Sequence, residues 1–340
     1  MRIAILSTFP PTACGIGEYA AQQARHLEAQ GHTVERVRLE ELREKGWRTG
    51  KDGALRAALA AVDRADRVIV HYQIGLLKDE SRRVRGLGYF APQAGLLRLL
   101  RRAGKKGEVV VHESSYKLYR GPGEFVQYPV SWVVHRAAHR LVFHTEFERK
   151  AFEERFFRHP RAEVRPHHGE FTPNVEADRA TARQRLGLPA GEHVTLCIGF
   201  YTPSKGFPEF AEAFAAALAD GTLPKDRHLH VVTSVRVPTD RAAQEGLAKL
   251  EARWAGHPNL HVRNQFVSPE EFDLWVLASD VVALPYTSTF SSGVAARARL
   301  LGRRILAAAV GGLPEQLGPG DLAYDGPDGL RAAFRAIAAS

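Results

Sequence analysis

The stretch that decides the fold lies in the second half of the chain, at residues 280–309, and reads DVVALPYTSTFSSGVAARARLLGRRILAAA. It has the pattern of a short buried strand, a turn crowded with serine, threonine and glycine, a helix that starts at Val294 or Ala295, and a second strand. This order predicts a parallel βαβ unit. A turn of small hydroxyl residues before a helix presents free backbone N–H groups at the positive end of the helix dipole, so it is a candidate anion site.

Outward from this stretch, short β-rich runs alternate with helical segments along all 340 residues. The first half is predicted to contain strands at residues 2–7, 33–39, 67–72, 108–113, 140–144 and 162–166. The second half is predicted to contain strands at residues 193–200, 228–234, 259–266, 280–285, 304–309 and 322–325. A cluster of Gly, Pro and Asn at 167–174 separates the halves. We therefore predict an α/β protein with two Rossmann-like domains, residues 1–170 and 171–340, that face each other across a cleft.

Composition bounds the class of protein. Hydrophobic content of 44% with 25% charged residues is typical of a soluble globular protein. The N-terminus lacks the apolar run and cleavage site of a signal peptide, and apolar runs are too short to span a membrane, so we expect a cytoplasmic protein. Cys14 and Cys197 form neither a disulfide framework nor a metal-binding pair, and we expect two buried cysteines and no metal site.

The net charge of +9 is unevenly placed. Residues 1–168 carry +11 and residues 169–340 carry −2. This asymmetry indicates that the first half faces an anionic partner, such as a lipid surface or a phosphorylated substrate, unless it only reflects a chain rich in arginine. The sequence contains no helix-turn-helix, zinc-finger or RNP-type pattern, so nucleic acid is not expected as a partner.

A basic helical segment bears on the membrane question. The run LLRLLRRAGKK, residues 96–106, joins leucines to five basic residues, and Arg82, Arg83 and Arg85 lie shortly before it. Two interpretations stand: a peripheral contact with anionic lipid at the inner face of a membrane, or an ordinary Rossmann helix with its leucines inward and its basic face in water.

Two further loops follow predicted strands. Gly15 and Gly17, in STFPPTACGIGEYA, allow close approach of the backbone to a ligand or serve only to reverse the chain. Lys205, in GFYTPSKGFPEFAEAF, places an ammonium group at a helix start, where it opposes the dipole unless an anion is bound. Together with the turn at Ser291 to Gly293, Lys205 is predicted to hold a diphosphate.

At this point the chain resembles a known family. The segments FPPTACGIGEYA, VIVHYQIGLL, RLVFHTEFER, GFYTPSKGF and DVVALPYTSTFSSGVAARARLLGRRILAAAVGGLPEQL are similar to landmarks of the family 4 glycosyltransferases, which have the GT-B fold. The resemblance implies a retaining, metal-independent hexosyltransferase-like enzyme without a cofactor. It implies a nucleotide-sugar-binding C-terminal domain and an acceptor-binding N-terminal domain. The acceptor is undetermined: a saccharide, a lipid-linked molecule or a small molecule.

The resemblance also implies roles for individual residues. Lys205 matches the diphosphate-binding lysine, and His112 lies where many relatives have a histidine near the reacting sugar, unless it is only a satisfied strand-end histidine. The remaining positions are assigned to donor binding: Gly15, Gly17, Asn264, Phe266, Val267, Thr289, Ser291, Ser292, Gly293, Val294 and Arg297.

Two departures from the family pattern stand out. Thr289 and Arg297 occupy the positions of a glutamate pair, and Phe200 and Thr202 occupy the usual places of an arginine. A guanidinium only donates hydrogen bonds, so Arg297 cannot grip ribose hydroxyls as a carboxylate does. Four interpretations stand: Arg297 replaces the missing arginine, recognises an unusual donor, marks an inactive relative, or pairs with an acid such as Glu315.

We therefore expect a transferase that moves a sugar from a nucleotide-diphosphate sugar to an acceptor hydroxyl. Charge on the departing nucleoside diphosphate would be stabilised by Lys205 and by helix N-termini. One rival is a catalytically inactive GT-B homologue that acts as a binding or partner subunit. The other is a two-domain small-molecule binding protein of the periplasmic type.

Overall fold

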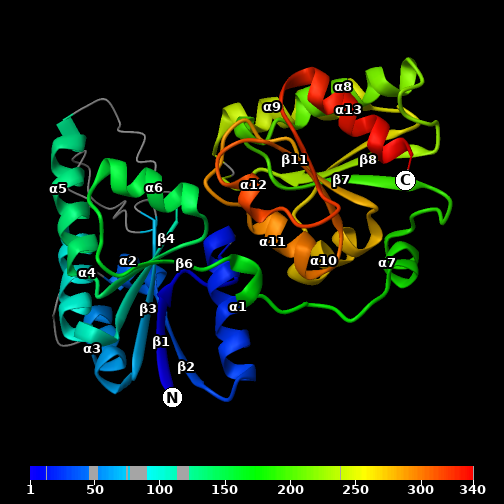
Figure 1. Cartoon of the computed structure of the whole chain (residues 1–340). Helices are drawn as coiled ribbons and strands as arrows, with labels where there is room; N and C mark the ends of the chain where they lie inside the picture. The colour runs from blue at the N-terminus through cyan, green and yellow to red at the C-terminus, as the bar shows by residue number, and fades with distance from the viewer. Residues whose placement is uncertain are drawn as a thin grey trace. The chain divides into compact units, whose positions relative to one another are not determined.

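The computed structural model describes residues 1–12, 14–45, 53–73, 76, 90–112, 122–237 and 239–339. The chain divides into two units, Met1–Glu170 and Phe171–Ser340. Each unit contains a six-stranded sheet whose paired strands are all parallel. Helices flank both sheets, as the ribbon shows (Figure 1). The predicted α/β architecture with two Rossmann-like domains is confirmed.

The first unit has the strand order β2-β1-β3-β4-β5-β6. Its strands are β1 (Arg2–Ser7), β2 (Thr33–Arg38), β3 (Arg67–Tyr72), β4 (Gly107–Val111), β5 (Arg140–Phe143) and β6 (Ala162–Val164). Its helices are α1 (Gly15–Ala29), α2 (Leu39–Lys45), α3 (Ala54–Arg64), α4 (Phe90–Ala103), α5 (Pro122–Ala137) and α6 (Glu146–Arg155). All six predicted strands are present, each within two residues of its predicted ends.

The second unit has the order β12-β11-β10-β7-β8-β9. Its strands are β7 (His193–Phe200), β8 (Arg227–Ser234), β9 (Leu260–Asn264), β10 (Val281–Leu284), β11 (Arg304–Ala308) and β12 (Leu322–Tyr324). Its helices are α7 (Arg179–Leu186), α8 (Phe207–Ala219), α9 (Arg241–Trp254), α10 (Pro269–Ala278), α11 (Gly293–Leu300), α12 (Leu313–Gln316) and α13 (Gly326–Ala338). The strand that precedes the serine-rich turn, β10, lies between β11 and β7, at the centre of the sheet.

The core lies on both faces of each sheet. In β7, Cys197 packs on one side, while Leu196 and Ile198 pack on the other. Side chains of a strand alternate between faces, so a strand buried on both sides is a continuous apolar run, as in HVTLCIGF. Cys14 and Cys197 are buried free thiols, which confirms the expected core role.

Helix ends follow their sequence signals. Ser268 accepts a hydrogen bond from the amide of Glu271 at the start of α10, and Pro269 occupies the first turn. Ser292 accepts one from Ala295 at the start of α11, which therefore begins at Gly293, one or two residues before its predicted start. The N-termini of these helices are fixed by side chains that the sequence places there.

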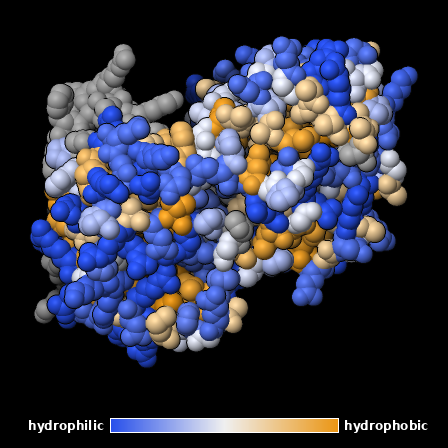
Figure 2. Space-filling view, viewed as in Figure 1, coloured by the Kyte–Doolittle hydropathy of each residue, from blue (hydrophilic) through white to orange (hydrophobic). Residues whose placement is uncertain are grey.

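The basic helix α4 has the features of an ordinary Rossmann helix. Leu96, Leu99 and Leu100 are buried in the core, whereas Arg101 and Arg102 are exposed, and Arg102 pairs with Asp63 at 2.5 Å. Arg82, Arg83 and Arg85 lie outside the described residues. Polar side chains cover most of the face in Figure 2, with apolar ones scattered among them. Within the described residues, no helix is both long enough and apolar enough to cross a membrane. The membrane interpretation therefore gains no support.

Candidate functional site

The turn that carries Lys205 packs directly against the end of β10. Gly206 has a φ of +63°, and a Cβ at this position would lie 2.0 Å from the carbonyl oxygen of Pro285. The amide of Thr287 donates to the carbonyl of Ser204 at 2.9 Å. Glycine at 206 is required because only a residue without Cβ permits both the left-handed φ and this contact. The two turns are thereby held together.

This packing places Lys205 beside the start of α11. The ammonium Nζ lies 3.7 Å from the centre of the Tyr286 ring. The hydroxyl of Tyr286 lies 3.4 Å from Oγ of Ser292, the residue that caps α11. The side chain of Lys205 and the turn at Ser291 to Val294, 86 residues apart at their nearest, therefore lie on one face of the second unit.

The serine-rich turn is fixed by one side chain that sequence reasoning missed. Gln316 accepts from the amide of Ser292 at 2.7 Å and donates back to its carbonyl at 3.0 Å. Thr289 donates to the carbonyl of Ser291 at 2.8 Å. Glutamine is common on protein surfaces, and nothing in the sequence around Gln316 indicates that its side chain contacts a turn 24 residues earlier.

Two backbone donors of the turn are open. The amide of Ala295 is taken by the cap and that of Ser292 by Gln316. In the part of the chain that the structure describes, the amides of Gly293 and Val294 donate to no protein atom. Gly293 is exposed. Val294 is half-buried. Two open amides at the positive end of a helix, with an ammonium group nearby, form an anion-binding arrangement.

Arg297 lies in the interior of the second unit. It is 5% exposed, and its Nε and Nη2 donate to the two carboxylate oxygens of Asp273 at 2.5 and 2.6 Å. Its Nη1 donates to the carbonyl of Thr172 at 2.8 Å. The backbone amide of Asn174 donates to the same carboxylate at 2.7 Å. Among the four interpretations, the geometry is that of an ion pair, with Asp273 and not Glu315 as the acid. The donor-binding role of Arg297 stays a prediction.

The three residues predicted near the nucleobase lie at the end of β9 and just beyond it. Phe266 is 60% exposed, and its ring stacks on that of Phe200 with centres 6.1 Å apart and an interplanar angle of 25°. Asn264 is exposed and donates to Glu251 at 3.0 Å, and Val267 is half-buried. Phe200, which is half-buried, thus extends the aromatic surface of the exposed Phe266. An aromatic ring pair that is open to solvent on one side is suited to stacking with a base.

The two glycines near the N-terminus differ. A Cβ on Gly17 would lie 3.1 and 3.2 Å from Oγ1 and O of Thr8, so the first turn of α1 closely approaches the residue that follows β1. Gly15 has no atom within 4 Å of such a Cβ, and it is exposed. Close packing against Thr8 therefore explains why residue 17 is a glycine. The role of Gly15 in donor binding stays a prediction.

His112 does not stand alone at its strand end. Adjacent strands β3, β4, β5 and β6 each carry a histidine at or just beyond their carboxyl ends: His71, His112, His144 and His167. All four are buried. The edge of the Tyr19 ring contacts all four, with ring centres 5.0 to 5.5 Å apart. Sequence reasoning selected only His112, although each of the other three also lies in or just after a predicted strand.

Burial sets the charge state of these histidines. Desolvation lowers the pKa of His71 to about 3 and that of His144 to about 4, and lowers the pKa of His112 well below its usual value. The imidazoles of His71, His112 and His144 are therefore neutral at pH 7. Burial and the neighbouring Glu170 carboxylate, to which the hydroxyl of Tyr19 donates a short hydrogen bond, raise the pKa of Tyr19.

The fold of the chain is that of GT-B glycosyltransferases. The Anabaena protein HepE, solved with UDP and glucose, matches with a TM-score of 0.66 at 16% identity, over 99% of this chain and 89% of that one. Sucrose-phosphate synthase from Thermosynechococcus elongatus matches with a TM-score of 0.67 at 16% identity, over 100% and 90%. These identities are low, so the structural matches establish the fold alone.

Sequence comparison points to glycosyltransferases as well. The D-inositol 3-phosphate glycosyltransferase of Nocardioides sp. is 36% identical over 192 residues, 52% of this chain and 40% of that protein. The Streptomyces coelicolor enzyme of the same name is 38% identical over 138 residues, 40% of this chain and 30% of that protein. The chain thus spans less than half the length of these relatives. No family model matches it. The sequence relatives and the structural neighbours are glycosyltransferases, as the resemblance implied.

Proposed function

We propose that the protein is a glycosyltransferase that transfers a sugar, with retention of configuration, from a nucleotide-diphosphate sugar to an acceptor hydroxyl. The observation that carries this proposal is the placement of Lys205 beside the open amides of Gly293 and Val294 on one face of the second unit. One ammonium group and one helix N-terminus suit a diphosphate, because both supply positive charge to its oxygens.

The same groups would lower the barrier to transfer. When the bond between the sugar and the diphosphate breaks, negative charge grows on the departing phosphate oxygen. Lys205 and the two amides stabilise that charge in place, so the protein needs no metal ion at the diphosphate. The leaving phosphate accepts the proton of the acceptor hydroxyl, which attacks from the same face. His112 is assigned to the sugar in this proposal.

The donor is inferred from the aromatic surface and from the neighbours. Phe266 and Phe200 offer a stacking surface for a base. HepE was solved with UDP and with UDP-glucose, and another neighbour, the E. coli trehalose-6-phosphate protein, with UDP-2-fluoro glucose. We therefore place UDP-glucose first among the donors to test.

The acceptor is inferred more coarsely. The first half of the chain carries +11, and the sequence relatives are named for an inositol 3-phosphate. Both features favour an anionic acceptor such as a phosphorylated small molecule, which would meet a positive field on that domain. A cytoplasmic location, where nucleotide sugars are made, is part of the same proposal.

The direct test is donor turnover by the full chain and by Lys205→Ala. We expect hydrolysis or transfer of a nucleotide sugar above background, with kcat/KM lowered about 100- to 1000-fold by the substitution, as for other groups that stabilise developing charge. Lys225→Ala, which removes an exposed lysine of the same unit, is the matched control and should change turnover little. The anomeric configuration of the product, read by NMR, tests retention.

Two outcomes would contradict the proposal. Turnover that is equal in wild type and Lys205→Ala would remove the diphosphate role of this lysine. Nucleotide binding without any turnover would leave the inactive-homologue alternative, which rests on Thr289 and Arg297 in place of glutamates.

A further inference from the structure

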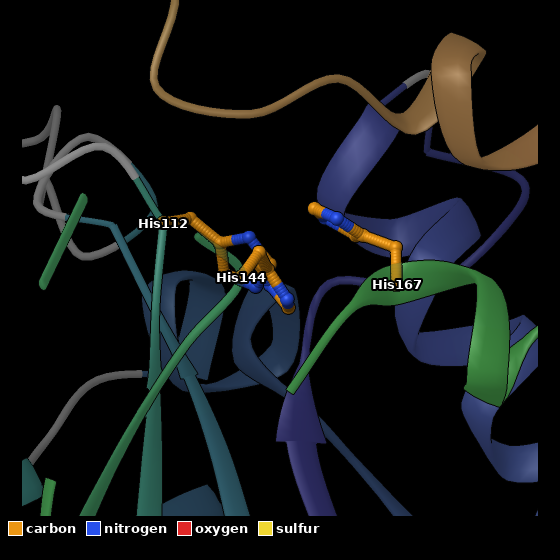
Figure 3. A group of neighbouring side chains, drawn as sticks. All are labelled: His112, His144 and His167. Carbon is orange, nitrogen blue, oxygen red and sulfur yellow. The ribbon is translucent and has the colours of Figure 1, made fainter. Parts of the chain in front are cut away.

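The histidine cluster of the first unit has an arrangement that packing does not require. Buried histidines are usually single and hydrogen-bonded to their surroundings, whereas here strand ends β4 and β5 and the turn η4 (His167–Glu170) bring three together. One ligand-capable nitrogen from each of His112, His144 and His167 lies within 4.8 Å of the other two. Figure 3 shows the three side chains directed toward one another.

The spacing is close to that of a metal centre. In a tetrahedral zinc site with Zn–N distances of 2.0–2.1 Å, ligand nitrogens lie about 3.3 Å apart. The ligand nitrogens of the three histidines lie within 4.8 Å of one another, and the rings of His144 and His167 stack with centres 3.5 Å apart, so these rings must rotate for their lone pairs to converge on one ion. Such a rotation changes side-chain torsions and leaves the strands in place.

His144 is oriented as a metal ligand is. Its Nδ1 lies 3.1 Å from the carbonyl oxygen of Arg165, which accepts a hydrogen bond only if Nδ1 carries the proton. The other nitrogen, Nε2, is then a bare lone pair, and it is buried with no hydrogen-bond partner in the described residues. A backbone carbonyl that fixes the tautomer from behind is the usual outer partner of a metal-bound histidine.

The tautomer of His112 is fixed by a chain of hydrogen bonds through His71 and Gln23. Nε2 of His71 lies 3.0 Å from Oε1 of Gln23 and donates to it, so Nδ1 of His71 is an acceptor. Nε2 of His112 lies 2.9 Å from that Nδ1 and must therefore carry a proton. The free lone pair of His112 is then on Nδ1. The hydrogen bonds of His71 and Gln23 thus leave one bare nitrogen on a second histidine of the three.

We propose that His112, His144 and His167 bind one divalent transition-metal ion, with Zn²⁺ as the first candidate. Neutral imidazoles suit zinc, copper, nickel and cobalt, and three of them leave one position of a tetrahedral site open. Glu170 accepts a hydrogen bond from the hydroxyl of Tyr19, whose ring contacts all three histidines, and also pairs with Arg165 at 3.4 Å.

The ligands of this site and the groups of the proposed diphosphate site belong to different units of the chain. The three histidines belong to Met1–Glu170, whereas Lys205 and the start of α11 belong to Phe171–Ser340. His112 has a place in both proposals, so metal binding is best measured without nucleotide sugar. Failure of either proposal leaves the other testable, because metal content and nucleotide binding are measured independently.

The experiment uses the full chain without a polyhistidine tag, stripped with EDTA and dialysed. Titration with Zn²⁺ is followed by calorimetry, and titration with Co²⁺ by its visible absorption. We expect one ion per chain, a Co²⁺ spectrum of tetrahedral type, and a higher melting temperature with metal than with EDTA. His144→Gln and His167→Gln should each weaken binding at least tenfold.

His139→Gln is the matched control, since it changes a partly exposed histidine of the same unit that is outside the cluster. It should bind metal as the wild type does. Circular dichroism in EDTA checks that each variant is folded. The proposal is overturned if the wild-type protein binds no stoichiometric Zn²⁺ or Co²⁺, or if His144→Gln and His167→Gln bind both ions as tightly as His139→Gln does.

Discussion

Arg297 is the residue whose role changes most once the fold is known. From the sequence it stands in a donor-binding position, yet its guanidinium is fixed on Asp273 and on the carbonyl of Thr172. Asp273 lies 24 residues earlier, on α10, and no local pattern links the two. Sequence reasoning listed an ion pair among four interpretations and named the wrong acid, because the partner is set by the packing of α10 against α11.

Removal of the acid should therefore reduce stability. Asp273 is 0% exposed, and Asp273→Asn leaves the positive charge of Arg297 buried without its counter-ion. We expect a loss of about 3–5 kcal/mol in the free energy of unfolding, measured by urea denaturation of the second unit's transition. Asp328→Asn, an exposed position, should cost less than about 0.5 kcal/mol. A loss below about 1 kcal/mol in Asp273→Asn would show that Arg297 does not depend on this pair.

At the scale of elements, most of the fold was predictable. Every strand of both sheets was predicted within two residues, because parallel strands buried on both faces appear as short apolar runs between helical segments. The start of α11, at Gly293, was predicted to within one or two residues from its serines and glycine. Serine caps and the loops that follow strands depend on a few neighbouring residues, so they can be predicted from a single sequence.

Contacts between elements that are far apart in the sequence could not be predicted. Gln316 fixes the serine-rich turn from α12, and Gly206 holds the Lys205 turn against Pro285. Neither contact joins residues at a sequence spacing that is typical of a helix, a strand or a turn. The histidine cluster is intermediate, since its four members follow successive strands and adjacent parallel strands end at one edge of a sheet, but the strand order needed to see this came from the structure.

The contact between the two turns can be tested at Gly206. Gly206→Ala adds a Cβ at 2.0 Å from a backbone oxygen, at a φ of +63°, so the turns must separate. We expect at least 2 kcal/mol of destabilisation together with weaker nucleotide binding.

Gly221→Ala is the matched control, because Gly221 has a similar φ of +76° with nothing within 4 Å of the added atom. It should cost about 1 kcal/mol and leave nucleotide binding unchanged. Equal effects of the two substitutions would mean that the left-handed φ, and not the contact with Pro285, explains the glycine at 206.

At the scale of the whole molecule, both units depend on buried neutral histidines. Burial and, to a smaller extent, the neighbouring His159 lower the pKa of His135, in the first unit, to about 4. Burial lowers the pKa of His230, in the second unit, to about 3, next to His261 and Arg263. The unfolded chain binds these protons near pH 6.5. Stability is therefore fully present above pH 6.5 and is lost as the pH falls toward the folded values.

Because of each of these two histidines, the free energy of unfolding of the unit that carries it should be about 2 kcal/mol lower at pH 5 than at pH 7.5. Urea unfolding at the two pH values measures the loss. His135→Gln and His230→Gln should each show a smaller loss for the unit that carries the change. Equal stability of the wild-type protein at pH 7.5 and pH 5 would contradict this account.

The central claim is that Lys205 and the start of α11 together hold a diphosphate. The most direct measurement is calorimetric titration of the wild-type chain, Lys205→Ala and Lys225→Ala with UDP, GDP, ADP and dTDP, and with the monophosphate of whichever base binds best. The account predicts that the diphosphate binds at least tenfold more tightly than the monophosphate in the wild type and in Lys225→Ala, and that Lys205→Ala abolishes most of this preference. A preference that is absent in the wild type, or undiminished in Lys205→Ala, would contradict it.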